Sequence, residues 1–315
     1  MEKYLVTGGA GFIGSNIVEK LLKDGHTVRV IDSFITGKEE NLAPFIKDIE
    51  LIRDDIRDIE AIRKAAKGME YILHQAALRS VPKSVDNPTL TNDINVNGTL
   101  NVFIAAKEAG IKRVVYASSS SVYGDCEAFP EREDYKPSPI SPYAVSKLTG
   151  EYYGYTFTKT FGLEVTSLRY FNVFGPRQNP ESKYSAVVPI FIYRMLDDKQ
   201  PVIEGNGEQT RDFTYVANVV DANLAAAKAN GAAGEVFNVA CGTTNSVIDI
   251  VNRLNQYMNK SIKPEFAPSR RGDVRKTLAD TSKMKKILKL EPKVDFKSGL
   301  KMTLDWFKSA NVSIG

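Results

Sequence analysis

The sequence is poor in the residues that build metal centres and covalent cross-links. Its 315 residues include only two cysteines, two histidines and one tryptophan. Cys126 and Cys241 match no disulfide or metal pattern, so we expect two unrelated, buried thiols in a reducing compartment. No cluster of histidine, cysteine and acidic residues is present, and we therefore expect no metal site.

An excess of charge of one sign and long apolar runs are also missing. The chain has 42 basic and 38 acidic residues and a net charge of +4, too weak and too evenly spread to indicate nucleic-acid binding. No apolar run approaches the roughly 20 residues that span a bilayer. The N-terminus MEKYLVTGGAG lacks the features of a signal peptide. We expect a cytoplasmic protein with neither nucleic-acid nor membrane partners.

What the chain does contain is an alternation of β-rich and helical segments. The β-rich runs are YLVTGG, TVRVID, IELIRDD, YILHQAA, RVVYASSS and EVTSLRYFNVFG. Helical patterns separate them, near 12–24, 58–67 and 91–109 and from SPYAVSK onward. Strands nearly continuous in Val, Ile and Leu, alternating with helices, predict a parallel sheet covered on both faces. Right-handed crossovers then give an α/β fold with a doubly wound parallel sheet of the Rossmann type.

The pattern loosens after Phe174, where the polar loop GPRQNPESKY precedes short helices and isolated strands. We expect a second, smaller α/β domain here, set over the carboxyl edge of the sheet. The expected division gives residues 1–172 and about 213–240 to the first domain, and about 173–212 with 241–315 to the second. In this division VANVVDANLAAAKA and EVFNVA return to the first domain.

A glycine-rich turn, TGGAGFIGSN, lies between the first predicted strand and the first predicted helix. Gly8, Gly11 and Gly14 recur every third residue, and Gly9 completes a G-x-G-x-x-G spacing. Such glycines permit a tight turn and a close approach of the backbone to a pyrophosphate, while the helix N-terminus offers free N–H groups. A helix cap without a ligand is the alternative.

An acidic residue at the end of the second predicted strand selects the cofactor. Asp32 follows Gly14 by eighteen residues (32 − 14). A carboxylate at this place accepts hydrogen bonds from a ribose diol and repels a 2′-phosphate. The turn and the acid together predict NAD rather than NADP. Asp54 and Asp55 end the third strand, where they would meet the adenine, with a solvated acidic loop as the alternative.

The stretch SPYAVSK places Tyr143 and Lys147 four residues apart. Ser141 suits an N-cap and Pro142 the first helical position, so the tyrosine and the lysine share one face of a helix. A nearby ammonium lowers the pKa of a phenol from its usual value of about 10. A tyrosine tuned in this way can act as a general acid or base.

The strand before this helix ends in ASSSSVYG, which puts Ser119 and Ser120 at the carboxyl edge of the sheet. Ligands bind at that edge in doubly wound folds. A serine hydroxyl there can hydrogen-bond the same substrate oxygen that the tyrosine deprotonates. Tyr-x-x-x-Lys alone is common, but with the glycine turn, Asp32 and these serines it predicts a catalytic site.

In TGGAGFIG, HQAA, NVNGT, SSSSVYG, YAVSK and LRYFNVFGPRQ the chain resembles, in order and over nearly its whole length, the extended short-chain dehydrogenases/reductases of the NAD-dependent epimerase/dehydratase family. Within that family it is most similar to the UDP-sugar 4-epimerases, in particular those acting on N-acetylated hexosamines. The resemblance implies a UDP-sugar substrate and a catalytic set of Ser119, Tyr143 and Lys147, with Ser120 as the rival serine. Tyr143 would take the proton of the 4-hydroxyl, and NAD would take the hydride of C4 and return it to the other face of the 4-keto sugar.

The resemblance also implies further contacts with both ligands. The expected cofactor-binding residues are Gly8, Gly11, Phe12, Ile13, Gly14, Asp32, Ser33, Gly37, Asp55, Ile56, Gln75, Ala76, Ala77, Arg79, Tyr143 and Lys147. The expected substrate-binding residues are Ser119, Ser120, Asn172, Arg211, Arg270, Asp273 and Thr277. Arginine forks suit a diphosphate, although an interdomain salt-bridge network would use the same residues, and Arg79 would serve equally as a solvated charge.

Two features narrow the reaction and the substrate. Related dehydratases carry an Asp-Glu pair after the catalytic hydroxyl and related decarboxylases usually keep a carboxylate, whereas this chain has Ser120 and Ser121. The machinery for a second acid–base step is therefore missing, which favours epimerisation. By resemblance, Thr277 replaces a bulky tyrosine of the epimerases restricted to plain hexoses. We expect interconversion of UDP-GlcNAc and UDP-GalNAc, and also of UDP-Glc and UDP-Gal.

Other functions stay open at this point. A UDP-glucuronate 4-epimerase shares the ASSSSVYG run but needs a cation at C6, and a reductase of a 4-keto nucleotide sugar would consume soluble cofactor. A non-catalytic NAD-binding regulator on the same fold is the alternative from another class. By resemblance, the helices predicted near 91–109 and 143–161 pair with a second subunit in a homodimer.

Overall fold

The computed structural model describes residues 1–126, 128–180, 187–268 and 275–310. Its centre is a seven-stranded sheet in the order β11-β6-β5-β4-β1-β2-β3, and every pair in it is parallel. The strands are β1 Lys3–Thr7, β2 Thr27–Asp32, β3 Ile49–Arg53, β4 Tyr71–His74, β5 Arg113–Ser119, β6 Glu164–Tyr170 and β11 Val236–Val239. The predicted doubly wound α/β fold is confirmed.

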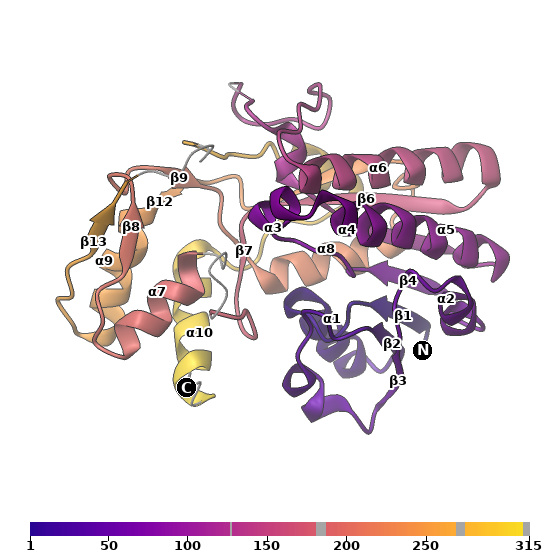
Figure 1. Cartoon of the computed structure of the whole chain (residues 1–315), viewed down its shortest axis with the longest axis horizontal. Helices are drawn as coiled ribbons and strands as arrows, with labels where there is room; N and C mark the ends of the chain where they lie inside the picture. The colour runs from indigo at the N-terminus through magenta and orange to yellow at the C-terminus, as the bar shows by residue number, and fades with distance from the viewer. Residues whose placement is uncertain (127, 181–186, 269–274, 311–315) are drawn as a thin grey trace.

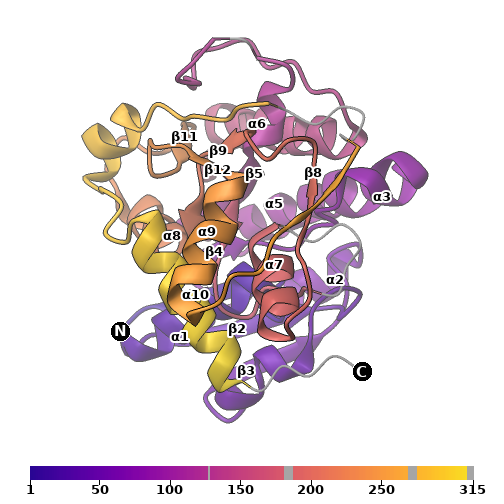
Figure 2. The same cartoon turned by 90° about the vertical axis from the view of Figure 1, so that its left-hand side faces the viewer.

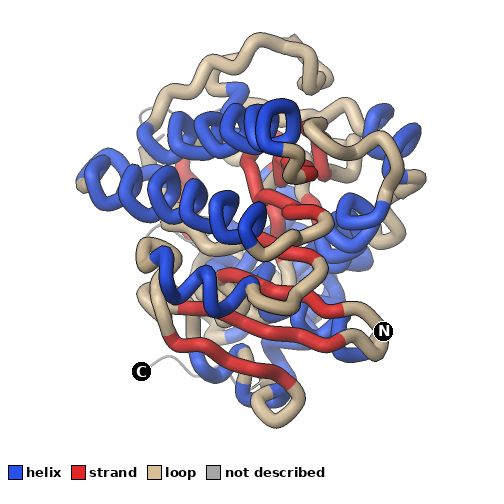
Figure 3. The backbone as a smooth tube through the Cα atoms, turned by 90° about the vertical axis from the view of Figure 1, so that its right-hand side faces the viewer, coloured by secondary structure: helices blue, strands red, loops and turns tan. Residues whose placement is uncertain are grey.

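Helices cover both faces of this sheet (Figures 1 and 3). The side chains of β1 alternate between two cores, with Val6 in one and Leu5 in the other, as expected of a strand buried on both faces. One core is closed by α1 Phe12–Lys23 and α8 Val216–Lys228. The other is closed by α2 Ile59–Ala66, α5 Thr99–Glu108 and α6 Pro142–Phe161.

The strand order reverses direction between β1 and β4. From β1 the chain builds outward to β3, then returns and builds in the other direction through β4, β5 and β6 to β11. Because all strands are parallel, the loops after β1, β2, β4, β5 and β6 open on one edge of the sheet. This edge, at the switch point, is where ligands bind in doubly wound folds.

The remaining elements gather at one end of the sheet, on the left of Figure 1 and facing the viewer in Figure 2. They are α7 Val187–Leu196, α9 Val247–Met258 and α10 Phe296–Ser309, with the paired short strands β8 Val202–Glu204 and β13 Glu265–Ala267, and β9 Thr210–Arg211 and β12 Asn245–Ser246. Two more short strands, β7 Val173–Phe174 and β10 Thr214–Tyr215, pair beside them. Although β11 joins the sheet, the exact two-domain division stays a prediction.

Some details differ from the sequence prediction. The helix predicted near 91–109 is interrupted: it begins at the end of α4 Pro88–Asn92, passes through a π-helical stretch Asp93–Gly98 and continues as α5, while α3 Val81–Asp86 precedes it. The wide π turn carries Asn95, whose amide bonds both backbone groups of Leu78 and the Ser146 hydroxyl. Cys126 and Cys241 are free as predicted, but they are half-buried rather than buried. No helix within the described ranges is long and apolar enough to cross a membrane.

A glycine contact brings α6 against β5. Gly150 lies on the face of α6 that touches the fully buried ring of Tyr116, and a Cβ atom at this position would overlap that ring. The Tyr116 hydroxyl donates to the Lys147 carbonyl one turn earlier, at 3.4 Å. The spacing between α6 and β5 therefore depends on having glycine at position 150. This spacing also sets the position of the side chains at the start of α6.

We expect Gly150→Ala to destabilise the fold by up to about 2 kcal/mol, because overpacking a core costs about 1–3 kcal/mol and alanine recovers only about 1 kcal/mol of helix propensity. Urea unfolding followed by circular dichroism would measure it. Thr149→Ala, one position along and away from Tyr116, is the matched control. A variant as stable as the parent chain would show that Gly150 does not set the helix–sheet spacing.

Candidate functional site

The turn after β1 forms a cradle of bare backbone. Gly8 has φ of 69°, in the left-handed region that favours glycine, and its N–H donates to the Ile31 carbonyl at 2.8 Å. A Cβ at Gly8 would come within 2.7 Å of Ala76 Cα, and a Cβ at Gly14 would overlap the Gly8 carbonyl oxygen. The predicted Phe12 and Ile13 begin α1, whose first N–H groups have no partner within the helix. Gly11 caps that helix.

Asp32 stands beside this cradle, at the end of β2. Its carboxylate accepts from Ala10 N and Phe34 N, both at 2.8 Å, which fixes its orientation. Burial raises the pKa of Asp32, although these two backbone donors oppose the rise. Gly37 lies against the carboxylate, because a Cβ there would come within 2.9 Å of Asp32 Oδ1. Ser33 is exposed next to it.

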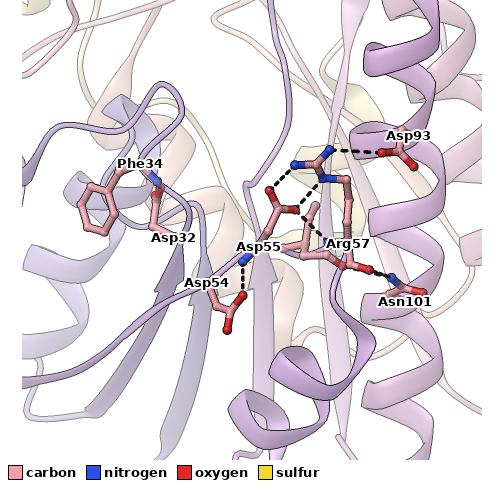
Figure 4. A network of polar contacts seen from close by, with 8 residues as sticks. Asp32, Phe34, Asp54, Asp55, Arg57, Asp93 and Asn101 are labelled. Atoms are coloured by element: carbon pink, nitrogen blue, oxygen red, sulfur yellow. Dashed lines mark hydrogen bonds and ion pairs between the residues drawn. The ribbon is translucent and has the colours of Figure 1, made fainter.

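The two acidic residues after β3, Asp54 and Asp55, have different partners (Figure 4). Asp55 forms an ion pair with Arg57, at 2.9 Å, and Arg57 also reaches Asp93 at 3.2 Å. Burial opposes ionisation of Asp55, but the bonds from Arg57 leave its pKa below the usual value. Asp54 is exposed and accepts from Asp55 N. Between Asp55 and Arg57, Ile56 is buried.

The segment after β4 lines the same edge. Ala76 N donates to the Thr7 hydroxyl at 3.3 Å, which places residues 75–77 against the glycine cradle, with Ala77 half-buried beside it. The Gln75 side chain bonds Asn223 at 3.0 Å and accepts from the Tyr170 hydroxyl at 3.2 Å. Any cofactor contact of Gln75 would therefore involve its backbone or the remaining capacity of its amide.

Ser119, Tyr143 and Lys147 meet where β5 ends and α6 begins. Ser141 caps α6 and Pro142 opens it, as predicted. The Ser119 hydroxyl lies beside the Tyr143 phenol and acts to lower its pKa, and it accepts a hydrogen bond from the Ser121 hydroxyl at 2.9 Å. Lys147 Nζ lies 6.0 Å from the centre of the Tyr143 ring. This geometry favours Ser119 over Ser120 as the serine that assists the tyrosine.

The expected lowering of the Tyr143 pKa is wrong for the protein by itself. Burial raises this pKa, and the Ser119 hydrogen bond and the Arg79 charge only reduce the rise. Lys147 is buried and donates to the Ala117 carbonyl at 2.7 Å. Burial lowers the pKa of Lys147 to about 7. A phenol this buried needs a further cation to ionise near neutral pH.

Arg79 lies close enough to Tyr143 for the two groups to interact electrostatically. Its side chain is exposed, yet burial by the surrounding protein lowers its pKa, and it feels the charge of the Tyr143 phenolate. Both observations hold for a guanidinium in a cleft open to solvent. We predicted Arg79 as a contact to cofactor phosphates, which stays a prediction; its guanidinium also interacts electrostatically with the Tyr143 phenol.

The structure brings together three of the predicted substrate-binding residues, Asn172, Arg211 and Thr277. Asn172 Nδ2 donates to the Thr277 hydroxyl at 3.0 Å, and Asp212 N donates to the same hydroxyl at 3.1 Å. Asn172 and Arg211 line a cavity of about 260 Å³ together with Phe174, Glu204 and Phe213. The predicted Arg270 and Asp273 lie outside the described residues.

Sequence reasoning missed the groups around Lys147. Glu151 is buried one turn further along α6 and pairs with the buried Arg169, whose Nη2 lies 2.8 Å from Glu151 Oε2. Ser118, on β5, donates a short hydrogen bond to the same carboxylate. The available signal was a second four-residue step, since Tyr143, Lys147 and Glu151 form Tyr-x₃-Lys-x₃-Glu.

The described residues fit NAD and offer no site for a metal ion. Side chains at Gly8 and Gly14 would collide with neighbouring backbone, so the turn leaves its backbone open to a pyrophosphate. The Asp32 carboxylate is held in a fixed orientation, and its spacing from the glycines is the one typical of an acid that binds a ribose diol. No group of three metal-binding side chains exists in the part of the chain that the structure describes.

Known proteins share this arrangement. A "Putative UDP-glucose 4-epimerase" of Methanocaldococcus jannaschii is 38% identical over 98% of this chain and 99% of its own. The solved UDP-N-acetylglucosamine 4-epimerase of Methanobrevibacter ruminantium, in complex with UDP-N-acetylmuramic acid, has a TM-score of 0.94 and 40% identity, covering 98% of this chain and 99% of the other. The UDP-glucose 4-epimerase of Thermotoga maritima with UDP-glucose gives 0.93 and 38%, over 98% and 99%. The family model that matches residues 4–240 is that of the NAD dependent epimerase/dehydratase family, and the chain belongs to this family.

Proposed function

We propose that the chain is a UDP-sugar 4-epimerase that interconverts UDP-GlcNAc and UDP-GalNAc, and also UDP-Glc and UDP-Gal. The observation that carries the proposal is the Ser119 hydroxyl beside the Tyr143 phenol at the sheet edge, with Lys147 Nζ 6.0 Å from the ring centre and only serines at the next two positions. Dehydration or decarboxylation needs a further acid or base there.

In this proposal Tyr143 accepts the proton of the sugar 4-hydroxyl and later returns it to the 4-keto oxygen. Ser119 holds the same oxygen by its hydroxyl. Bound NAD supplies a hydride acceptor and donor and adds a positive charge near the phenol. The Gly8–Gly14 cradle and Asp32 hold the cofactor, with the contacts of residues 75–77 beside them.

The proposed pocket for the nucleotide diphosphate is the cavity between Asn172 and Arg211. An arginine fork and an amide suit phosphate oxygens and a uridine, and two aromatic rings, Phe174 and Phe213, form its apolar wall. Arg270 and Asp273 keep their proposed roles toward the diphosphate and the uridine ribose by resemblance alone.

The proposed preference for N-acetylated sugars rests on Thr277. Its hydroxyl accepts hydrogen bonds from Asn172 and from the backbone of Asp212, so the residue stands in the shell of the proposed substrate pocket. A short side chain there leaves room that a tyrosine would fill.

UDP-glucuronate is the second candidate substrate, because the exposed guanidinium of Arg79 acts on Tyr143. A cation near the reacting carbon could pair with a C6 carboxylate. The assay below therefore includes this sugar.

We further propose a cytoplasmic homodimer joined through α5 and α6. Val145 and Tyr152 are 50% and 61% exposed, and because they are seven residues apart they lie on the same face of α6. Leu90 of α4, which precedes α5 in the chain, is exposed as well. Light scattering during size-exclusion chromatography tests the assembly; a mass of 34.9 kDa, that of one chain, would contradict it.

Tyr143→Phe should lower epimerisation of UDP-GlcNAc by about 10²–10⁴-fold, because the general acid–base group is lost. The purified protein, with no cofactor added, is incubated separately with UDP-GlcNAc, UDP-Glc and UDP-glucuronate, and proton NMR follows the anomeric signals. Tyr152→Phe, on the exposed side of the same helix, is the control and should retain full activity. Equal rates for Tyr143→Phe and the parent chain would rule out the proposed role.

Thr277→Tyr should lower the rate for UDP-GlcNAc relative to UDP-Glc by about 10–200-fold, because the phenol fills the space next to C2. The ratio of the two rates is the measurement, since it cancels general damage to the Asn172 and Asp212 contacts. Thr277→Ser keeps the hydroxyl and should keep the ratio. An unchanged ratio in Thr277→Tyr would contradict the assigned role in substrate selection.

A further inference from the structure

Lys147 is a buried ammonium with few groups to balance its charge. Within α6 it faces Tyr143 and Glu151, one turn on either side. From β5 it faces Tyr116, whose ring centre lies 5.0 Å from Nζ, and from β4 it faces His74. His74 is neutral, because burial first and the Lys147 charge second lower its pKa to about 3.

Glu151 is the carboxylate of this group. It is buried, and Arg169 binds it with two parallel hydrogen bonds, Nε to Oε1 at 2.9 Å and Nη2 to Oε2 at 2.8 Å. Ser118 supplies a third hydrogen bond from β5. These partners hold the carboxylate fixed between β5, β6 and α6, one helical turn from Lys147.

The order in which Lys147 and Tyr143 lose their protons decides whether the lysine can help the tyrosine. Burial lowers the pKa of Lys147 to about 7, and the Glu151 charge opposes this fall. Burial raises the pKa of Tyr143. A lysine that is already neutral contributes no field to a phenol that ionises later. The fraction of Lys147 that is charged near neutral pH therefore depends on nearby anions that raise its pKa.

We propose that Glu151 is a positioning residue that keeps Lys147 in its ammonium form beside Tyr143, and that Arg169 and Ser118 hold the Glu151 carboxylate in place for this purpose. The catalytic consequence rests on the proposed function, whereas the effect on Lys147 does not. A purely structural ion pair between α6 and β6 would need no particular distance from Lys147.

The test is the titration of Lys147 itself. Protein labelled with [ε-¹³C]lysine is followed by NMR from pH 5 to 11, and the signal of Lys147 is assigned by its absence in Lys147→Met. The parent chain should titrate near 7 at this site, whereas an ordinary lysine titrates at about 10.4. Glu151→Gln should move the midpoint to lower pH by about one unit or more, because an adjacent opposite charge is removed. In the same variant kcat for UDP-GlcNAc should fall at neutral pH while KM changes little.

Two further variants separate charge from shape. Ser118→Ala removes a hydrogen bond to the carboxylate but leaves its charge, and should move the Lys147 midpoint less than Glu151→Gln does. Breaking one side of a buried pair can unfold a protein, whereas replacing both partners is often tolerated. Should Glu151→Gln not fold, Glu151→Gln/Arg169→Gln should still lower the midpoint, because the Glu151 charge is the one that raises the Lys147 pKa. A midpoint equal to that of the parent chain in whichever of these variants folds would overturn the proposal. Because this titration needs no turnover, a chain without epimerase activity would still give a clear result.

Discussion

A buried ammonium next to a buried phenol is the constraint on which the rest of the site depends. Removing an isolated charge from water costs several kcal/mol unless partners compensate for it. The chain meets this cost for Lys147 with the Ala117 carbonyl, the Tyr116 ring and the Glu151 carboxylate. The first two require α6 to lie close against β5, which a glycine at position 150 permits, whereas Glu151 belongs to α6 itself.

The parallel sheet assembles the rest of the site, because it brings loops that are far apart in the chain to one edge. The cradle at Gly8, the acid at 32, the segment at 75–77 and the serines after β5 are separated by up to 112 residues (120 − 8), yet each follows a strand of the same sheet. The smaller region then covers this edge with Asn172, Arg211 and Thr277.

The sequence was informative wherever function is carried by local backbone geometry or by a fixed step along one element. The glycine turn, Asp32 at a strand end and the capped helix that begins at Pro142 were all predictable for that reason. Contacts across elements were not. Nothing in the local pattern shows that Arg169 of β6 pairs with Glu151, that Arg79 faces Tyr143, or that burial outweighs the lysine and raises the tyrosine pKa. These contacts depend on how the helices pack on the sheet. Hydrophobic periodicity predicts that the layers pack, but not which side chains meet.

The most direct test of the account is the fate of the hydrogen on C4. If one enzyme-bound cofactor removes and restores it, UDP-[4-²H]GlcNAc incubated with the purified protein in ordinary water should give UDP-GalNAc that keeps its deuterium at C4, with none released to solvent. Mass spectrometry and ²H NMR of the product would measure this. Loss of the label to water, or conversion only when a soluble reductant is added, would contradict an epimerisation in which Tyr143 moves the proton and the hydride never leaves the site.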